Sequence, residues 1–272
     1  MIRLVLALIV LAAPAWTQER RPSHCIAVAQ SAPGMVYLHQ AGFRDPLPVF
    51  TVRIRYVSHS SFLIQGGGYS AVTDYAGFVG SADFTPDIVT MNHAHSTHFT
   101  HNPDPAIPHA LRGWGLFGEG AEHHLDLGRM LVRNVPTDIR LGENGREPNG
   151  NSIFVFETEG LCIAHLGHLH HEPTDAQYAA IGRMDVVMVP VDGGYTMAVD
   201  SMINVMRRVK ASVILPMHWF TDMTLERFLR GMEDDGFMIA RPGTSEVEVS
   251  LRTLPERPTV VALRPALLRD DE

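Results

Sequence analysis

Positive charge is what this sequence most lacks. Lys210 is the single lysine in 272 residues, arginine supplies the remaining cationic side chains, and the formal net charge is −8. A protein that binds nucleic acid needs a stripe of basic side chains to neutralise phosphates, and the sequence offers none. The composition therefore argues against a nucleic-acid partner.

The sequence also has only two cysteines and no internal repeats. Cys162 stands in an apolar run and is expected to be a small buried side chain, whereas the residues before Cys25 do not fit a lipoprotein cleavage site. A disulfide between the two stays open, and we expect neither to be catalytic. Without internal repeats, low-complexity tracts or linkers, and with a 45% hydrophobic share, the chain is expected to form one domain with a sizeable core.

The N-terminus has the organisation of a secretory signal. Arg3 precedes the apolar run LVLALIVLAA, which is too short to span a membrane comfortably, and Ala13-Pro14-Ala15 resembles an A-x-A cleavage site. We predict a signal peptide over residues 1–15, no stable membrane anchor after its cleavage, and a periplasmic or secreted protein. An uncleaved anchor and a misassigned start codon are the alternatives.

Histidine, in contrast, is abundant and placed at strand ends. Three apolar runs open into histidines: DIVTM into His93, His95, His98 and His101; LCIA into His165, His168, His170 and His171; and VILPM into His218. Open α/β sheets hold their ligands at the C-terminal ends of strands, and imidazole is the commonest metal ligand. A single histidine would more often be an ordinary core or surface residue. Three such groups, far apart in sequence, predict a metal site that folding assembles.

The remaining pattern predicts an α/β protein. Strands are expected over 50–75 with a turn at Gly66–Gly68, over PDIVTM, over 123–136 and 151–166, and over MDVVMVP and VILPMHW. Helices are expected over 173–182, with Thr174 as N-cap, and over 196–210 and 224–236. We expect two sheets covered by helices, with an irregular segment over 16–48, the domain over 49–255 and a C-terminal tail over 256–272.

The ordered motifs resemble those of the metallo-β-lactamase superfamily, whose hallmark is H-x-H-x-D-H after a strand. Here the hallmark stands as His93-Ala94-His95-Ser96-Thr97-His98. The nearer likeness is to the branch that contains ascorbate-phosphate lactonase, through Ser58-His59-Ser60-Ser61-Phe62, Thr73-Asp74-Tyr75, His165-Leu166-Gly167-His168, Pro190-Val191-Asp192-Gly193 and Pro216-Met217-His218-Trp219. The resemblance implies a single-domain, four-layer αββα sandwich and a metal-dependent hydrolase.

The chain departs from this family at two carboxylates. Thr97 replaces an aspartate that ligates the second metal, and His168 replaces the aspartate that bridges two metals. The third histidine of the first site is missing from NVPTDIRLG, where Asp138 is the nearest candidate. The resemblance thus implies His93, His95, His98, His168 and His218 as ligands, with Asp138 as a further candidate. The loss of carboxylates favours one ion over two, or an ion softer than magnesium. We expect one or two zinc ions, with iron or manganese as alternatives.

An ion held by imidazoles with an open position lowers the pKa of bound water from about 15.7 to about 7. The expected substrate is a small molecule with an ester, lactone, amide or phosphoester group. Because Thr97 cannot act as a base, His171, His165 or Asp138 is expected to orient or deprotonate the water.

His59 and Asp74, with Thr97 and His165, are expected to fix the ligand loops, or else to make ordinary turn hydrogen bonds. The segment around Trp114 is either a flap or an exposed loop. A catalytically degenerate metal-binding or ligand-binding protein, and a mononuclear iron enzyme, remain as other functions.

Overall fold

The computed structural model describes residues 21, 23–27, 42–116, 118–142 and 145–270. The predicted signal peptide over residues 1–15 lies outside this part of the chain. Within it, no helix is long and apolar enough to cross a membrane.

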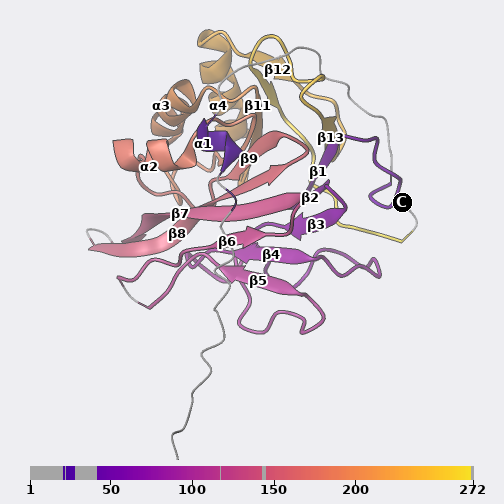
Figure 1. Cartoon of the computed structure of the whole chain (residues 1–272). Helices are drawn as coiled ribbons and strands as arrows, with labels where there is room; N and C mark the ends of the chain where they lie inside the picture. Colours follow the sequence, from indigo (N-terminus) through magenta and orange to yellow (C-terminus); the bar gives the residue numbers. More distant parts are fainter. Residues whose placement is uncertain (1–20, 22, 28–41, 117, 143–144, 271–272) are drawn as a thin grey trace, which may run out of the picture.

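Two mixed sheets form the centre of the molecule (Figure 1). The strands of the first are β1 (Val52–Ser58), β2 (Ser61–Gly66), β3 (Tyr69–Val72), β4 (Ile88–Met91), β5 (His109–Arg112) and β13 (Glu246–Val249). The strands of the second are β6 (His124–Asp126), β7 (Met130–Leu141), β8 (Gly145–Thr158), β9 (Leu161–His165), β10 (Val186–Pro190), β11 (Val213–Met217), β12 (Met238–Ala240) and β14 (Thr259–Val261). Their orders are β13-β1-β2-β3-β4-β5 and β12-β14-β11-β10-β9-β8-β7-β6.

The helices lie against the second sheet. They are α1 (His24–Ala27), α2 (Asp175–Ile181), α3 (Val199–Val209) and α4 (Asp222–Asp234). Figure 1 shows α2, α3 and α4 on the side of this sheet that faces away from β1–β5. The apolar stripe of α3, which includes Met202 and Met206, packs there with Phe228 of α4 and Val187 of β10. Thr174 and Gln177 form the predicted capping box of α2.

A second core lies between the sheets and a third covers the outer face of the first sheet. Ile54 and Phe62 pack against Phe154 and Leu215 in the space between the sheets. On the outer face, Val89 and other strand residues are covered by irregular segments that include Phe43, Ile107 and Leu268. The predicted α/β sandwich is confirmed; in the described part of the chain, irregular segments form its outer layer on this side.

Parallel pairing brings the carboxyl ends of several strands to one edge. β9, β10, β11, β14 and β12 are parallel neighbours, and Pro190 at the end of β10 is paired with Met217 at the end of β11. The residues that follow these strands therefore leave the sheet side by side. The turn between β1 and β2 meets them there, because the backbone N–H of His218 donates to the carbonyl of His59 (2.9 Å).

Two sequence expectations about the chain ends need correction. Residues 259–261 form β14 between β11 and β12, so the expected C-terminal tail contributes an inner strand. That strand is only three residues long and follows a proline, which weakens its pattern. The segment expected to be irregular over 16–48 contains α1, and Cys25 of α1 forms a disulfide with Cys162 of β9. Cys162 is buried as expected, but as half of a cross-link.

Candidate metal centre

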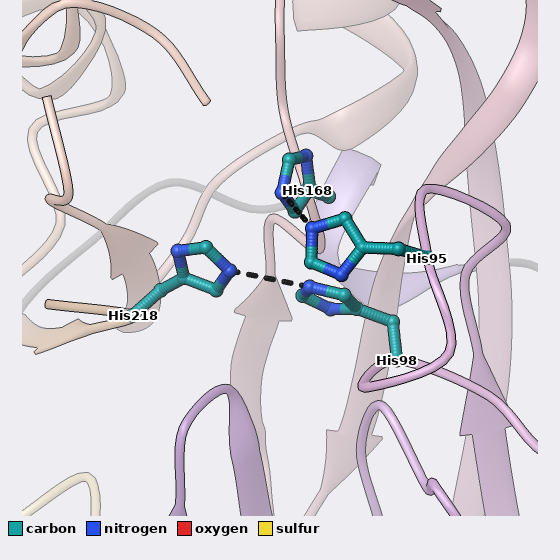
Figure 2. A group of neighbouring side chains, drawn as sticks. All are labelled: His95, His98, His168 and His218. Atoms are coloured by element: carbon teal, nitrogen blue, oxygen red, sulfur yellow. Dashed lines mark hydrogen bonds between the residues drawn. The ribbon is translucent and has the colours of Figure 1, made fainter. Parts of the chain in front are cut away.

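Four histidines from three separate loops converge on one point (Figure 2). His95 and His98 follow β4, His168 follows β9, and His218 follows β11. The Nε2 atoms of His95 and His168 are 3.0 Å apart, and those of His98 and His218 are 3.2 Å apart. All four ligand atoms lie within 4.8 Å of one another, and only His95 is exposed.

Two of these imidazoles are held from behind by buried carboxylates. Nδ1 of His98 lies 2.6 Å from Oδ2 of Asp74, and Nδ1 of His218 lies 2.9 Å from Oδ2 of Asp192. A carboxylate that accepts from Nδ1–H fixes the ring orientation and leaves Nε2 with a lone pair directed inward. Each pair is therefore a carboxylate–histidine arrangement of the kind that supports a metal ligand.

The surroundings keep both carboxylates ionised. Burial alone would raise the pKa of Asp74, but the neighbouring His165 and His98 and the hydrogen bonds of His98 and Asn92 outweigh burial, so the pKa is lowered. For Asp192, burial is likewise outweighed, first by the hydrogen bond from His218 and then by hydrogen bonds from the following loop, and the pKa is again lowered.

The facing nitrogens fit a cation. Because Asp74 and Asp192 accept from Nδ1–H, the Nε2 atoms of His98 and His218 both carry lone pairs, and two lone pairs cannot hydrogen-bond across the 3.2 Å that separates them. A tetrahedral ion about 2.1 Å from each of four nitrogens sets them about 3.4 Å apart. The distances and the all-imidazole donor set thus fit one transition-metal ion, of which zinc, copper, iron and nickel accept such ligands.

The partners of the other two cluster histidines are an imidazole and a hydroxyl, and Nδ1 of His168 lies 3.1 Å from Nε2 of His170. Nδ1 of His95 lies 2.8 Å from Oγ1 of Thr97, which lies 3.2 Å from Nε2 of His59. With His95 Nε2 directed inward, its Nδ1–H donates to the Thr97 hydroxyl, which in turn donates to His59. Burial, followed by the nearby His218, lowers the pKa of His59 to about 3, which keeps this ring a neutral acceptor. Thr97 therefore orients His95 from the position where the family has an aspartate.

His165 lies behind the cluster, and both of its ring nitrogens are hydrogen-bonded to backbone groups. Its Nε2 lies 2.7 Å from the carbonyl of Ser60, and its Nδ1 accepts from the N–H of Gly167. Burial lowers its pKa, and the lowering persists although the nearby Asp74 opposes it. Because both ring nitrogens are engaged, His165 holds the two loops together, and this arrangement does not favour it as the group that deprotonates water.

His93 does not join the cluster. Its Nδ1 lies 2.9 Å from Oε1 of Glu147, and its ring stacks on Trp114 with centroids 5.1 Å apart. Among the described residues, the ligand atoms of the other four histidines lie within 4.8 Å of one another, and His93 is not one of this group. The structure therefore does not bring His93 to the other four histidines, because its side chain contacts a carboxylate and an indole ring from two distant segments; its ligation of a metal stays a prediction.

Asp138, the further candidate ligand, and His171, a candidate base, are also engaged elsewhere, as is the nearby Asn151. Asp138 pairs with Arg146 at 2.8 Å and accepts from the N–H of Asn149. Asn151 accepts from the N–H of His168 at 2.8 Å. Burial, then Arg146, lowers the pKa of His171. Among the described ring contacts, His171 meets His170 and no cluster histidine.

Sequence reasoning quoted Asp192 in a motif but assigned it no role. Oδ1 of Asp192 accepts from the N–H groups of Gly194, Tyr195 and Thr196, while its Oδ2 holds His218. The signal was an aspartate followed by two glycines directly after a buried strand. Such a turn exposes successive backbone N–H groups to one carboxylate.

Comparisons with known proteins identify the family and the fold. Residues 53–218 match the family model described as a beta-lactamase superfamily domain. A proposed Zn-dependent hydrolase of the metallo-β-lactamase superfamily from Thermotoga maritima has a TM-score of 0.58 and 27% identity, over 78% of this chain and 98% of that chain. A metal-dependent hydrolase from Methanospirillum hungatei is 24% identical over 187 residues, which are 62% of this chain and 84% of that protein. A metallo hydrolase from Ignicoccus hospitalis, 16% identical, shares the fold with a TM-score of 0.53 over 80% of this chain and 96% of that chain.

The chain belongs to the metallo-β-lactamase superfamily. The resemblance expected from the sequence is confirmed at this level, and the nearer likeness to the ascorbate-phosphate lactonase branch stays a prediction.

Proposed function

We propose that this protein is a hydrolase that uses one metal ion, zinc, held by His95, His98, His168 and His218. The observation that carries the proposal is the convergence of four Nε2 atoms within 4.8 Å, with two of the rings held by buried aspartates. When bound there, the ion would supply a Lewis acid and an activated water for attack on an ester, lactone, amide or phosphoester. The names of the relatives from Methanospirillum hungatei and Thermotoga maritima support this class of reaction.

The residues of the chain have separate tasks in this proposal. Asp74 and Asp192 hold His98 and His218 in the tautomer that binds metal, and their two negative charges balance a divalent ion. Thr97 and His59 hold His95, the exposed member of the set, at the side from which substrate can arrive. His165 fixes the turn between β1 and β2 against the loop of His168.

The hydrogen bonds and ion pairs of the residues that could hold a second ion favour one ion over two. A second ion would need His93 and two further ligands, but His93 is paired with Glu147 and Asp138 with Arg146. The side chain of Asn151, in β8, already accepts a hydrogen bond from the backbone N–H of His168. Recruiting these side chains would break an ion pair or a buried hydrogen bond for each ligand gained.

A non-catalytic metal site is the second candidate, and the donor count favours it. Four protein ligands complete a tetrahedral zinc ion, as in structural sites, whereas catalytic sites keep a position open. Against this, His95 is exposed and its partner Thr97 is exposed too. Catalysis therefore requires either a fifth position or exchange of His95.

Metal content tests the proposal, with His93 as the matched control. We expect about one zinc per chain in the parent protein and in His93→Ala, because His93 faces Glu147 and not the cluster. His95→Ala and His218→Ala should bind zinc at least about tenfold more weakly, because each loses one of four ligands. Elemental analysis and competition with a chromophoric chelator measure both quantities, and circular dichroism checks that each variant is folded. Two ions in the parent, or equal loss in His93→Ala, would contradict the single-ion site.

We further propose that the mature protein is periplasmic or secreted, supported by the signal-like N-terminus and the disulfide between Cys25 and Cys162. Structural disulfides persist in oxidising compartments. Protein recovered from the periplasm of its host should therefore have no free thiols. Reduction should lower its free energy of unfolding by about 2–5 kcal/mol, because the bond closes a long loop.

The matched control is the Cys25→Ser, Cys162→Ser variant, whose urea transition should not move when reductant is added. Recovery of the protein from the cytoplasm with both thiols free would refute the localisation.

A further inference from the structure

Two large aromatic side chains stand exposed beside the cluster. Tyr195 is 66% exposed and Phe220 is 59% exposed, and their rings meet edge to face with centroids 5.3 Å apart. Tyr195 lies in the loop between β10 and α3, and Phe220 in the loop between β11 and α4. Two exposed aromatic rings beside a polar site form an apolar surface, which an apolar group of a ligand can cover.

This pair is continuous with the cluster. The ring of Phe220 lies 5.3 Å from that of His218 and 5.6 Å from that of His59. The rings of His59 and His218 are themselves 4.1 Å apart. An apolar group resting on Phe220 and Tyr195 would thus keep an attached polar group within reach of the cluster. We call Tyr195 and Phe220 the aromatic wall.

The loop that presents Tyr195 is fixed from both sides. The carboxylate of Asp192 accepts from three successive N–H groups of residues 194–196. The guanidinium of Arg140 donates to the carbonyls of the same three residues, at 2.7, 2.5 and 2.8 Å. Because this backbone is already ordered, binding against Tyr195 loses little entropy. Asp192 also holds His218, so one side chain positions both a ligand and the aromatic wall.

The positive groups nearby are already used. Nη2 of Arg140 donates to the three carbonyls, and Arg146 is paired with Asp138 at 2.8 Å. The surface that adjoins the cluster is formed by the two aromatic rings, while these guanidinium groups are directed at partners of their own. Such a surface suits an uncharged apolar group better than a phosphate or carboxylate.

We propose that the aromatic wall is the subsite for an apolar, preferably aromatic, group of an uncharged carbonyl substrate. Esters, lactones and amides with such a group adjacent to the scissile carbonyl fit it, and phosphoesters do not. The inference rests on the proposed function, since it takes the four-histidine cluster as the metal centre. It narrows the substrate class of that same site.

Hydroxamic acids test the subsite without requiring turnover, because their head group chelates the ion and their side group can be varied. On zinc-loaded protein we expect phenylacetohydroxamic acid to bind about tenfold more tightly than acetohydroxamic acid. The Tyr195→Ala, Phe220→Ala variant should lose this preference while its affinity for acetohydroxamic acid stays within about twofold. Tyr195→Phe should retain the preference, because the ring and not the hydroxyl makes the contact. Isothermal titration calorimetry measures each affinity.

Phe50→Ala is the control for removal of an exposed aromatic ring. Phe50 is 64% exposed and precedes β1, at the opposite end of that strand from His59, so the preference should remain. An unchanged preference in the double variant would overturn the inference while leaving the metal site intact. So would a parent protein that binds the anionic succinic monohydroxamate more tightly than phenylacetohydroxamic acid. Failure of the parent to bind zinc, or of zinc-loaded parent to bind either neutral hydroxamate, would refute the proposed function and the inference together.

Discussion

Asp192→Asn should weaken zinc binding by about 10- to 100-fold although the side chain keeps its size. Oδ1 of Asp192 accepts from three N–H groups of the following loop, and an amide oxygen can do the same. The other end of the side chain changes from acceptor to donor, because an amide N–H would replace the carboxylate oxygen that lies 2.9 Å from Nδ1 of His218. An N–H that donates to Nδ1 forces the imidazole proton onto Nε2. The lone pair needed for the metal is then lost.

Competition with a chromophoric chelator at pH 7.5 measures the effect on affinity. Asp74→Asn should behave in the same way through His98, whose Nδ1 lies 2.6 Å from the Asp74 carboxylate. Asp185→Asn is the matched control, because Asp185 is buried but accepts from the N–H of Cys162 and meets no cluster histidine. Wild-type zinc affinity in Asp192→Asn, or an equal loss in Asp185→Asn, would show that the carboxylates do not set the tautomer.

The three strand-end histidine groups were predictable because each is a local pattern. An apolar run that ends in histidine places the side chain at a sheet edge whatever its partners are, so His95, His98, His168 and His218 could be named from the sequence. His93 has the same local pattern, but its side chain does not join the cluster. Its position depends on Glu147 and Trp114, both distant in sequence, and no spacing within the motif contains that information.

The parts of the structure that escaped prediction depend on pairings over long distances. The Cys25–Cys162 bond joins residues 137 positions apart, and two cysteines in a sequence do not reveal whether their backbones approach. Strand β14 has three residues and is stabilised by neighbours on both sides. Asp192 acts on His218 because β10 and β11 end in register, which becomes visible only once the strand order is known.

Metal-free protein should lose stability steeply as the pH falls below about 6.5. Burial lowers the pKa of His165, and burial followed by neighbouring imidazoles lowers that of His168. Both are therefore neutral when folded and take up a proton when unfolded. A group with a lowered folded-state pKa contributes its full stability above the unfolded value, near 6.5 for histidine, and loses it as the pH falls below. These two buried histidines contribute a loss of up to about 3 kcal/mol between pH 7.5 and 5.5, and His59, whose pKa is also lowered by burial, adds to it.

Urea unfolding in the presence of a chelator, repeated from pH 8 to 5, measures this slope. His165→Gln should reduce it by about 1.4 kcal/mol per pH unit below 6.5, because one of these protons is no longer taken up on unfolding. His101→Gln is the control, since His101 is exposed and its removal should leave the slope unchanged. Asp74 and Asp192 act in the same direction only at lower pH, because their lowered pKa values protect the fold until the carboxylates of the unfolded chain protonate, below about 4. A flat stability between pH 7.5 and 5.5 would mean that these histidines titrate in the folded protein as they do in the unfolded chain. His168 would then not be held in the buried, neutral state that metal binding requires, so the same measurement bears directly on the proposed centre.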